Sequence, residues 1–105
     1  MSLLKLLCKS LLILLCSCIG MAFAGAPPQY QKACALCHQE GRFGAPRTGV
    51  AGDWKARLAE GKELLVQHVK QGYNAMPAGG MCGSCSDQDY RALIEFMSTP
   101  KKDKP

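Results

Sequence analysis

Charged and aromatic side chains are both scarce in this sequence. Charged residues make up only 20% of the 105 residues and aromatic residues 7%, whereas hydrophobic residues reach 48%. An intrinsically disordered chain shows the opposite balance, so that class is excluded. Strand-like alternation, internal repeats and low-complexity tracts are also missing. At this length we expect one domain, and a large catalytic domain with a deep substrate cleft is not expected.

No apolar run is long enough to span a bilayer comfortably. The run that follows Lys9 holds about 15 residues, whereas a membrane-spanning helix needs about 20. Lys5 and Lys9 precede it, and Ala22 and Ala24 follow it in a small-x-small cleavage pattern. These flanks are typical of a secretory signal. We predict that residues 1–24 are a cleaved signal peptide and that residues 25–105 form a single domain in the periplasm.

Two alternatives to cleavage before Gly25 stay open. The apolar run could remain as an uncleaved membrane anchor. The segment from Leu15 to Cys18 also has a faint lipoprotein pattern, in which Cys18 would be acylated and hold the protein on a membrane.

Cleavage of the signal peptide changes the number of cysteines that must be explained in the mature chain. It removes Lys5, Lys9 and three of the seven cysteines, and it leaves 81 residues with a net charge of +3. The four remaining cysteines form two CxxC pairs, and an even count after an export signal fits an oxidising compartment. A chain of this size rarely builds a sufficient core unaided, so we expect a covalent staple or a cofactor.

The periodicity of the mature chain predicts a small all-α domain. The predicted helices are Gln29–His38, a short helix capped by Asp53 and ending at Ala59, Lys62–Gln71 with Gly72 as its stop, and a last helix opened by Ser86. Ser86 and Asp89 form a capping box for that last helix, whose apolar face is Tyr90, Leu93, Ile94 and Met97. The glycine-rich segments 41–52 and 73–83 read as long loops, which usually carry function.

The first CxxC pair carries the strongest chemical pattern. Cys34, Cys37 and His38 form the C-x-x-C-H arrangement of c-type haem attachment. Two thiols three residues apart on one helical turn can each form a thioether with a vinyl group, and the adjacent His38 is then directed at the iron. The alternatives are a redox-active CxxC or half of a zinc site, with His38 incidental. In an exported chain, we predict one covalent haem c.

A haem iron that shuttles electrons without binding small ligands needs a second axial ligand. Met76 lies in a glycine-rich loop and is followed by Pro77, which stiffens the chain just past the thioether. Met81 lies five residues later and is the competing candidate. Met97 fits the apolar face of the last helix and reads as a core residue. We predict Met76 as the ligand.

Together these motifs resemble a class I cytochrome c, and within that class the short bacterial cytochrome c5 group. The resemblance covers nearly all of the mature chain, from Tyr30 through the haem motif, Gly44-Ala45-Pro46, Trp54 and Met76-Pro77 to the second CxxC. It implies four to five short helices wrapped around one haem. It also implies that the first and last helices pack across each other, which suits Tyr30 and Tyr90. Pro46 matches the residue whose carbonyl accepts a hydrogen bond from the proximal histidine in that family.

The same resemblance implies a structural disulfide between Cys82 and Cys85. A four-residue ring adds little chain entropy, so its expected role is local shape. The functional alternative is a thiol–disulfide exchange site, since a CxxC at a helix N-terminus has a stabilised thiolate. A zinc site built from all four cysteines would leave His38 and Met76 unexplained.

Three further residues carry weaker expectations. Trp54 either donates its indole N–H to a haem propionate or simply packs against the ring. Arg47 either neutralises a propionate or is a solvated loop arginine. His68 reads as a surface histidine without an obvious partner, in preference to a second haem ligand.

The function that these observations predict is single-electron transfer rather than enzymatic bond chemistry. The expected partners are transient redox proteins, a reductase and an oxidase or dehydrogenase, with no nucleic acid and no substrate; a weak homodimer is left open. The charge of +3 predicts modest steering toward acidic surfaces. The alternative function is a haem protein with an open or displaceable sixth ligand, acting as a small-ligand sensor or enzyme.

Overall fold

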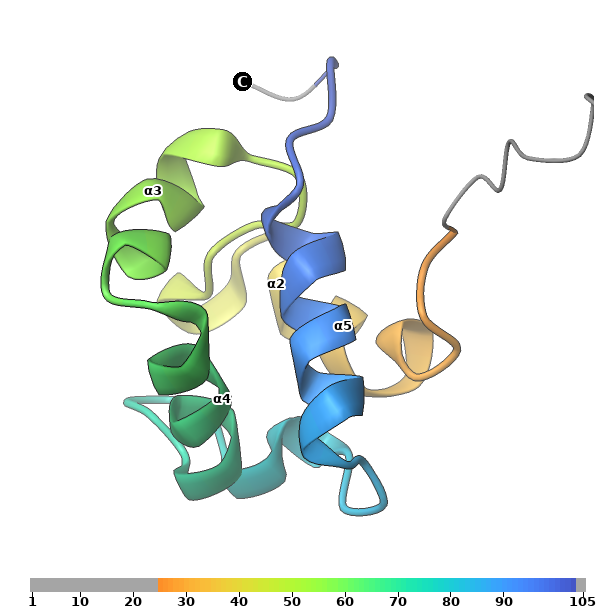
Figure 1. The fold of residues 1–105 in the computed structure, drawn as a ribbon. Coiled ribbons are helices and arrows are strands. Elements are labelled where there is room, and N and C mark those ends of the chain that lie inside the picture. The colour runs from red at the N-terminus through yellow and green to blue at the C-terminus, as the bar shows by residue number, and fades with distance from the viewer. Residues whose placement is uncertain (1–24, 104–105) are drawn as a thin grey trace, which may run out of the picture.

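The computed structural model describes residues 25–103, so the predicted signal segment 1–24 and the Cys18 alternative lie outside the described residues. Four α-helices follow one another within this range: α2 (Ala35–His38), α3 (Ala51–Ala59), α4 (Lys62–Gln71) and α5 (Asp87–Ser98) (Figure 1). Three short turns complete the helical content: the π-helical turn η2 (Tyr30–Cys34) and the 3-10 turns η3 (Arg42–Gly44) and η4 (Ala78–Met81). Residues 25–103 contain no strand. The predicted all-α fold is confirmed.

The first helix is continuous from η2 into α2. Gln29 stands at its N-cap and His38 is its last residue, as the sequence predicts, although its first turn is π-helical. The Tyr30 ring lies edge-on to the Phe96 ring of α5, with 4.9 Å between centroids. The Tyr30 hydroxyl donates a hydrogen bond to Thr48 Oγ1 at 2.9 Å. Tyr30 therefore links the first helix both to the last helix and to the loop after the CxxCH motif.

α3 begins three residues earlier than predicted. Its N-cap is Val50 rather than Asp53, and Asp53 lies in the first turn. The Asp53 carboxylate instead accepts bonds from the backbone N–H and the guanidinium of Arg47. A charged guanidinium in bidentate contact binds a carboxylate more strongly than a backbone amide does. The predicted capping role of Asp53 is therefore wrong.

The predicted limits of α4 and the predicted start of α5 are confirmed. Gly72 ends α4 with φ at +85°, a conformation that glycine adopts without steric cost. The Ser86 side chain accepts a bond from the Asp89 backbone, and the Asp89 carboxylate accepts one from the Ser86 N–H. Both halves of the capping box are thus present at the start of α5.

α4 and α5 pack against each other and provide much of the core. Leu65 and Val66 of α4 are buried in one cluster with the predicted apolar face of α5, which is Tyr90, Leu93, Ile94 and Met97. Three exposed ion pairs join the two helices: Lys62–Glu95, Lys70–Asp87 and Arg91–Glu63.

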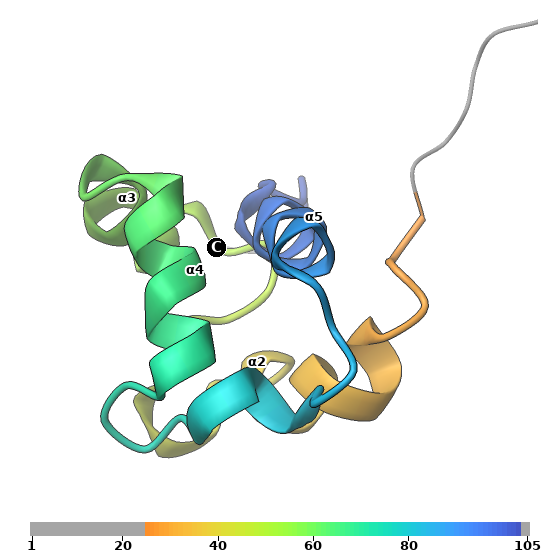
Figure 2. The same cartoon turned by 60° about the horizontal axis from the view of Figure 1, so that its bottom comes forward.

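Figure 2 shows α3 and α4 on one side of the molecule and η2 and α5 on the other, with the segment around η4 between them. No helix of residues 25–103 combines the length and the hydropathy needed to cross a membrane.

Candidate functional site

A cavity of about 370 Å³ lies between these elements. This volume falls in the range of pockets that hold drug-sized ligands and cofactors. The lining residues come from the first helix (Ala33, Cys34, Cys37, His38), the loop after it (Arg42, Phe43, Gly44, Ala45, Pro46), α3 and its end (Trp54, Ala56, Arg57, Glu60), α4 (Leu65, His68, Val69), the segment around η4 (Tyr73, Asn74, Ala75, Met76, Pro77, Gly80, Met81) and α5 (Ile94, Met97). The CxxCH motif and both loop methionines therefore face one space.

The two motif cysteines are free thiols on the cavity wall. Cys34 is buried and Cys37 is partly exposed. Burial raises the pKa of the Cys34 thiol to about 11, so it is a neutral thiol at physiological pH. Because the thiolate is the form that attacks disulfides, this environment does not suit a redox-active CxxC.

His38 is oriented by a backbone carbonyl. Its side chain is only 7% exposed, and Nδ1 donates to the Pro46 carbonyl at 2.8 Å, because that oxygen can only accept. Burial lowers the pKa of His38, and the positive charge of Arg57 acts in the same direction, although the Pro46 bond opposes both. The imidazole is therefore neutral at physiological pH, with Nε2 left as a lone-pair donor for a metal.

The three candidate methionines differ sharply in environment. Met97 is 3% exposed and lies in the core cluster, as predicted. Met81 is 62% exposed. Met76 is partly buried, and its methyl group lies 3.0 Å from the place where a Cβ on Gly80 would stand. Met97 also lines the cavity, so burial separates Met76 from Met81, whereas the place of Met97 in the core cluster separates it from Met76.

The residues present fit the haem that the motif predicts. Two free thiols and one neutral imidazole come from the first helix, and a thioether comes from the segment before η4. Gly80 keeps the space beside Met76 Cε clear, because any side chain there would meet both Met76 and Val69. The donor set, neutral nitrogen and thioether sulfur together with two thiols, is that of a c-type haem site.

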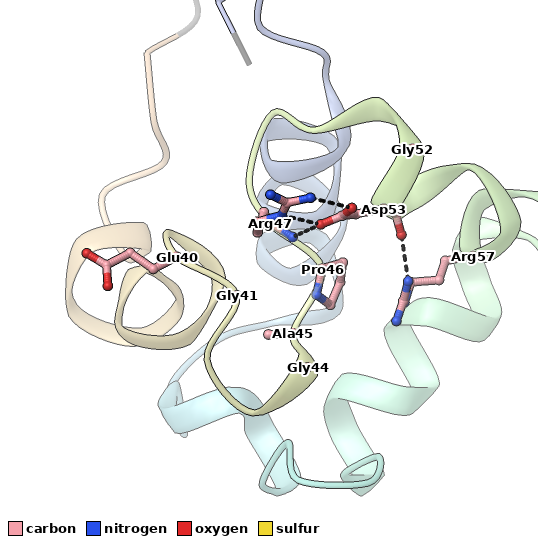
Figure 3. Close-up of a pocket in the computed structure, with 9 residues that line it drawn as sticks. All are labelled: Glu40, Gly41, Gly44, Ala45, Pro46, Arg47, Gly52, Asp53 and Arg57. Carbon is pink, nitrogen blue, oxygen red and sulfur yellow. Dashed lines mark hydrogen bonds and ion pairs between the residues drawn. The ribbon is translucent and has the colours of Figure 1, made fainter. Parts of the chain in front are cut away.

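Arg47 does not line this cavity. It lines a second, more polar cavity of about 550 Å³, together with Glu40, Gly52 and Asp53. The two cavities share Gly44, Ala45, Pro46 and Arg57. The Arg47 guanidinium faces Asp53 in the second cavity, at 2.8 Å from Nε and 3.1 Å from Nη2 (Figure 3). Of the two roles that the sequence left open for Arg47, this position and the pairing with Asp53 fit a loop arginine better than a propionate partner.

Trp54 lines the haem cavity but its polar hydrogen is already engaged. The indole N–H donates to the Arg47 carbonyl at 2.9 Å. The ring itself is 4% exposed and lies stacked near His38, with 6.0 Å between ring centroids. Of the two roles that the sequence left open, this geometry fits packing in the wall of the haem cavity rather than donation to a propionate.

Sequence reasoning missed the arginines that do face the cavity. Arg42 and Arg57 both line it, and Arg57 also donates to the Asp53 carbonyl at 2.6 Å. His68 likewise lines the cavity and stacks on Tyr73, with 4.1 Å between centroids. His68 is half-buried, and the expectation that it has no partner is wrong. A five-residue spacing across the Gly72 stop was the only sequence signal for that contact.

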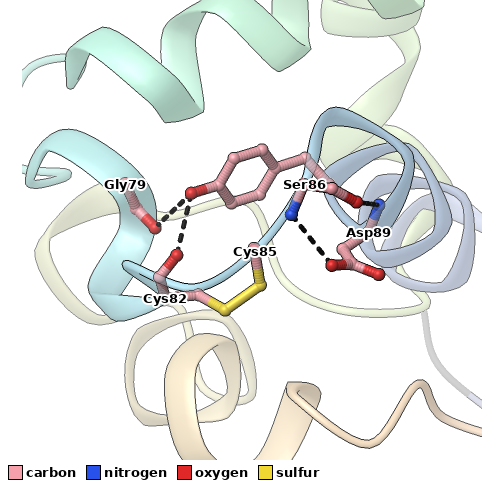
Figure 4. The surroundings of a disulfide bond; sticks show 6 residues. Gly79, Cys82, Cys85, Ser86 and Asp89 are labelled. Atoms are coloured by element: carbon pink, nitrogen blue, oxygen red, sulfur yellow. Dashed lines mark hydrogen bonds between the residues drawn. A yellow bond between two sulfur atoms is a disulfide. The ribbon is translucent and has the colours of Figure 1, made fainter.

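The second CxxC forms a disulfide between Cys82 and Cys85, with 5.4 Å between Cα atoms (Figure 4). It stands directly before the capping box of α5 and directly after η4. The Tyr90 hydroxyl of α5 contacts the carbonyls of Gly79 and Cys82. The segment that follows Met76 is therefore tied down at several points.

Comparison with known proteins places the whole described domain in one group. Residues 25–97 match the family described as cytochrome C oxidase, cbb3-type, subunit III. Over 69 residues the chain is 39% identical to a cytochrome c5 of Ectopseudomonas mendocina, a match that covers 64% of this chain and 79% of the relative.

Two solved structures extend the likeness to the fold. A mono-heme ferrocytochrome c from Shewanella putrefaciens is 51% identical with a TM-score of 0.65, and the match covers 77% of this chain and all of that one. A chain in the electron transfer complex of nitrite reductase with cytochrome c is 31% identical with a TM-score of 0.62, over 70% of this chain and 95% of that one.

Proposed function

This chain belongs to the c-type cytochrome family and carries one covalently bound haem c, and from that premise we propose that it is a periplasmic electron carrier with His38 and Met76 as axial ligands. When bound, the haem supplies a single-electron couple between ferric and ferrous iron. The observation that supports the proposal most strongly is that both proposed ligands line one cavity with the two motif cysteines.

Cys34 and Cys37 would hold the haem through thioethers, and His38 would bind the iron through Nε2. The Pro46 carbonyl fixes the tautomer of His38, because it accepts the Nδ1 hydrogen. Such a bond also makes the imidazole a better donor. Trp54 lies stacked near the His38 ring, with 6.0 Å between the ring centroids.

Met76 would bind from the segment before η4. Its backbone exchanges two hydrogen bonds with Tyr73, at 2.9 and 3.0 Å, and Tyr73 stacks on His68 of α4. A thioether favours ferrous iron and raises the reduction potential relative to a second histidine. With both axial positions occupied by side chains, the site would exchange electrons without binding small ligands.

The ligand assignment is tested with a matched pair of variants. Met76→Ala is expected to abolish the long-wavelength sulfur-to-iron absorption band of the oxidised protein, whereas Met81→Ala is expected to retain it. Loss of the band in Met81→Ala with retention in Met76→Ala would overturn the assignment.

Arg42 and Arg57 are the proposed charge partners of the haem carboxylates, since they line the cavity and Arg47 does not. Buried or half-buried carboxylates need such partners. Arg57→Gln is expected to change the reduction potential, and an unchanged potential in Arg57→Gln and Arg42→Gln would argue against this role.

The proposed partners are redox proteins that bind transiently. One structural relative is a cytochrome c in an electron transfer complex with nitrite reductase, which supports a small protein–protein docking event of this kind. The mature charge of +3 predicts that electron exchange with an acidic partner slows as salt rises. A weak homodimer stays a prediction, which sedimentation of the haem-loaded protein would test.

Export and cleavage before Gly25 remain part of the proposal. The family match begins at residue 25, the first residue after the predicted cleavage site. Mass spectrometry of the mature protein is expected to give Gly25 as its first residue; an acylated Cys18 or an intact leader would contradict it.

A further inference from the structure

Two thioethers compete for one cavity in this chain. Met76 precedes η4 and Met81 ends it, and both line the haem cavity. They lie five residues apart, one before η4 and one at its end, so both thioethers lie at the edge of the same cavity. The fold must therefore contain a feature that determines which of the two thioethers can reach the haem iron.

The backbone of Met81 is held in an unfavourable conformation. Its φ is +63°, in the left-handed region where a Cβ clashes with the neighbouring carbonyl. A residue other than glycine remains there only when its surroundings over-determine it. In that conformation the Met81 side chain is 62% exposed, while Met76 packs beside Gly80.

Tyr90 contacts the backbone on both sides of Met81, beside the turn's own hydrogen bond from the Cys82 N–H to the Gly79 carbonyl at 2.9 Å. The Tyr90 hydroxyl donates to the Cys82 carbonyl at 2.9 Å and also lies within hydrogen-bond distance, 3.2 Å, of the Gly79 carbonyl (Figure 4). These two carbonyls flank Gly80 and Met81. The Tyr90 side chain is 6% exposed and belongs to α5, so its hydroxyl is a fixed point. The disulfide ties Cys82 to the start of the same helix.

We propose that Tyr90 is a positioning residue that selects Met76 over Met81 as the iron ligand, by holding the backbone on both sides of Met81 in place. This inference rests on the proposed function, because it takes a thioether to be the second ligand. Without the hydroxyl, Met81 relaxes from its left-handed conformation, η4 loses its fixed geometry, and both thioethers sample the cavity.

The test uses the haem-loaded full domain with Tyr90→Phe, which removes the hydroxyl and keeps the buried ring. Tyr30→Phe is the matched control, since Tyr30 is also buried, at 5% exposed, and its hydroxyl bonds to Thr48, away from η4. Imidazole is added to the oxidised protein as a probe that displaces a weakly held thioether. Tyr90→Phe is expected to bind imidazole about fivefold more tightly than the wild type, as expected for loss of one buried hydrogen bond, and Tyr30→Phe is expected to match the wild type.

A second measurement reports which methionine is bound. The proton spectrum of the reduced wild type is expected to show one strongly shifted methionine methyl signal. The Tyr90→Phe variant is expected to show two such methyl signals, one for each methionine. The double variant Tyr90→Phe, Met81→Leu is expected to show only one. A single unchanged signal in Tyr90→Phe together with unchanged imidazole affinity would overturn the role of Tyr90 while leaving Met76 as the ligand. Absence of a shifted methionine signal in the wild type would instead overturn the proposed ligation itself.

Discussion

The imidazole of His38 has one nitrogen bonded to the protein and one free for a metal. The Pro46 carbonyl accepts from Nδ1, and burial keeps the pKa of the ring below its usual value. The loop that supplies this carbonyl is fixed in turn, because the Thr48 N–H donates to the His38 carbonyl at 2.7 Å. At the scale of single residues, the proximal side of the site is therefore built by the ten residues that follow the CxxCH motif.

Gly80 is the residue that keeps the opposite wall of the cavity clear. An added Cβ would lie 3.0 Å from Met76 Cε and 3.3 Å from Val69, and φ is +58°. Gly80→Ala is expected to destabilise the protein by about 1 to 3 kcal/mol through strain and crowding and to weaken the sulfur-to-iron band. Gly83→Ala is the control, since an added Cβ at Gly83 meets nothing within 4 Å. Equal stabilities and equal bands in the two variants would refute the role of Gly80.

The Arg47–Asp53 pair predicts a specific acid dependence. The Arg47 guanidinium lowers the pKa of the Asp53 carboxyl to about 2, from an ordinary value near 3.8. A lowered folded-state pKa stabilises the folded protein above the unfolded-state value, and that contribution is lost as pH falls from about 4 toward 2. Denaturant unfolding of the wild type is expected to lose stability across this window, and Asp53→Asn is expected to lose less. Parallel curves for the two proteins would show that the pair contributes nothing.

At the scale of elements, the start of α5 matters because this helix carries Tyr90 and follows the disulfide directly. Its capping box satisfies two backbone N–H groups. Ser86→Ala is expected to cost about 1 kcal/mol of stability. Ser84→Ala, two residues earlier and outside the box, is expected to be neutral. Thermal unfolding of both variants measures the difference, and a Ser84 variant as unstable as the Ser86 variant would argue against the cap.

The elements that the sequence predicted well are those whose signals are local. The limits of α4 follow from its apolar stripe and the Gly72 stop, and the start of α5 follows from Ser86 and Asp89. The start of α3 was missed because the partner of Asp53 is a loop arginine six residues earlier, which no helical periodicity reveals.

In the candidate site, too, the features that depend on neighbouring residues were predictable, whereas those that depend on distant contacts were not. CxxCH identifies the cofactor because its chemistry is contained in five consecutive residues. Which arginines face the cavity depends instead on the path of the loop 41–50 and on the placement of α3. The sequence therefore left the role of Arg47 open between a propionate partner and a solvated loop arginine, and it did not indicate that Arg42 and Arg57 line the cavity. The Tyr90 contacts with η4 join residues 8 and 11 positions apart across an irregular turn, and spacing alone does not indicate them.

At the scale of the whole molecule, the helices surround a cavity rather than a closed core. The cavity takes residues from the first helix, α3, α4 and α5, so the haem completes the packing that a domain of this size cannot supply alone. Under the proposed ligation, a molecule built in this way would hold the iron between the first helix and the segment before η4. The central claim is therefore that the iron is closed to outside ligands and that the protein only passes electrons.

Carbon monoxide added to the reduced, haem-loaded protein tests that claim most directly. Ferrous haem with a free or easily vacated position binds the gas and changes its visible spectrum, whereas iron held by His38 and Met76 does not. We predict the same reduced spectrum with and without carbon monoxide. A spectral change that saturates with the gas would contradict the account and favour a ligand-binding sensor or enzyme.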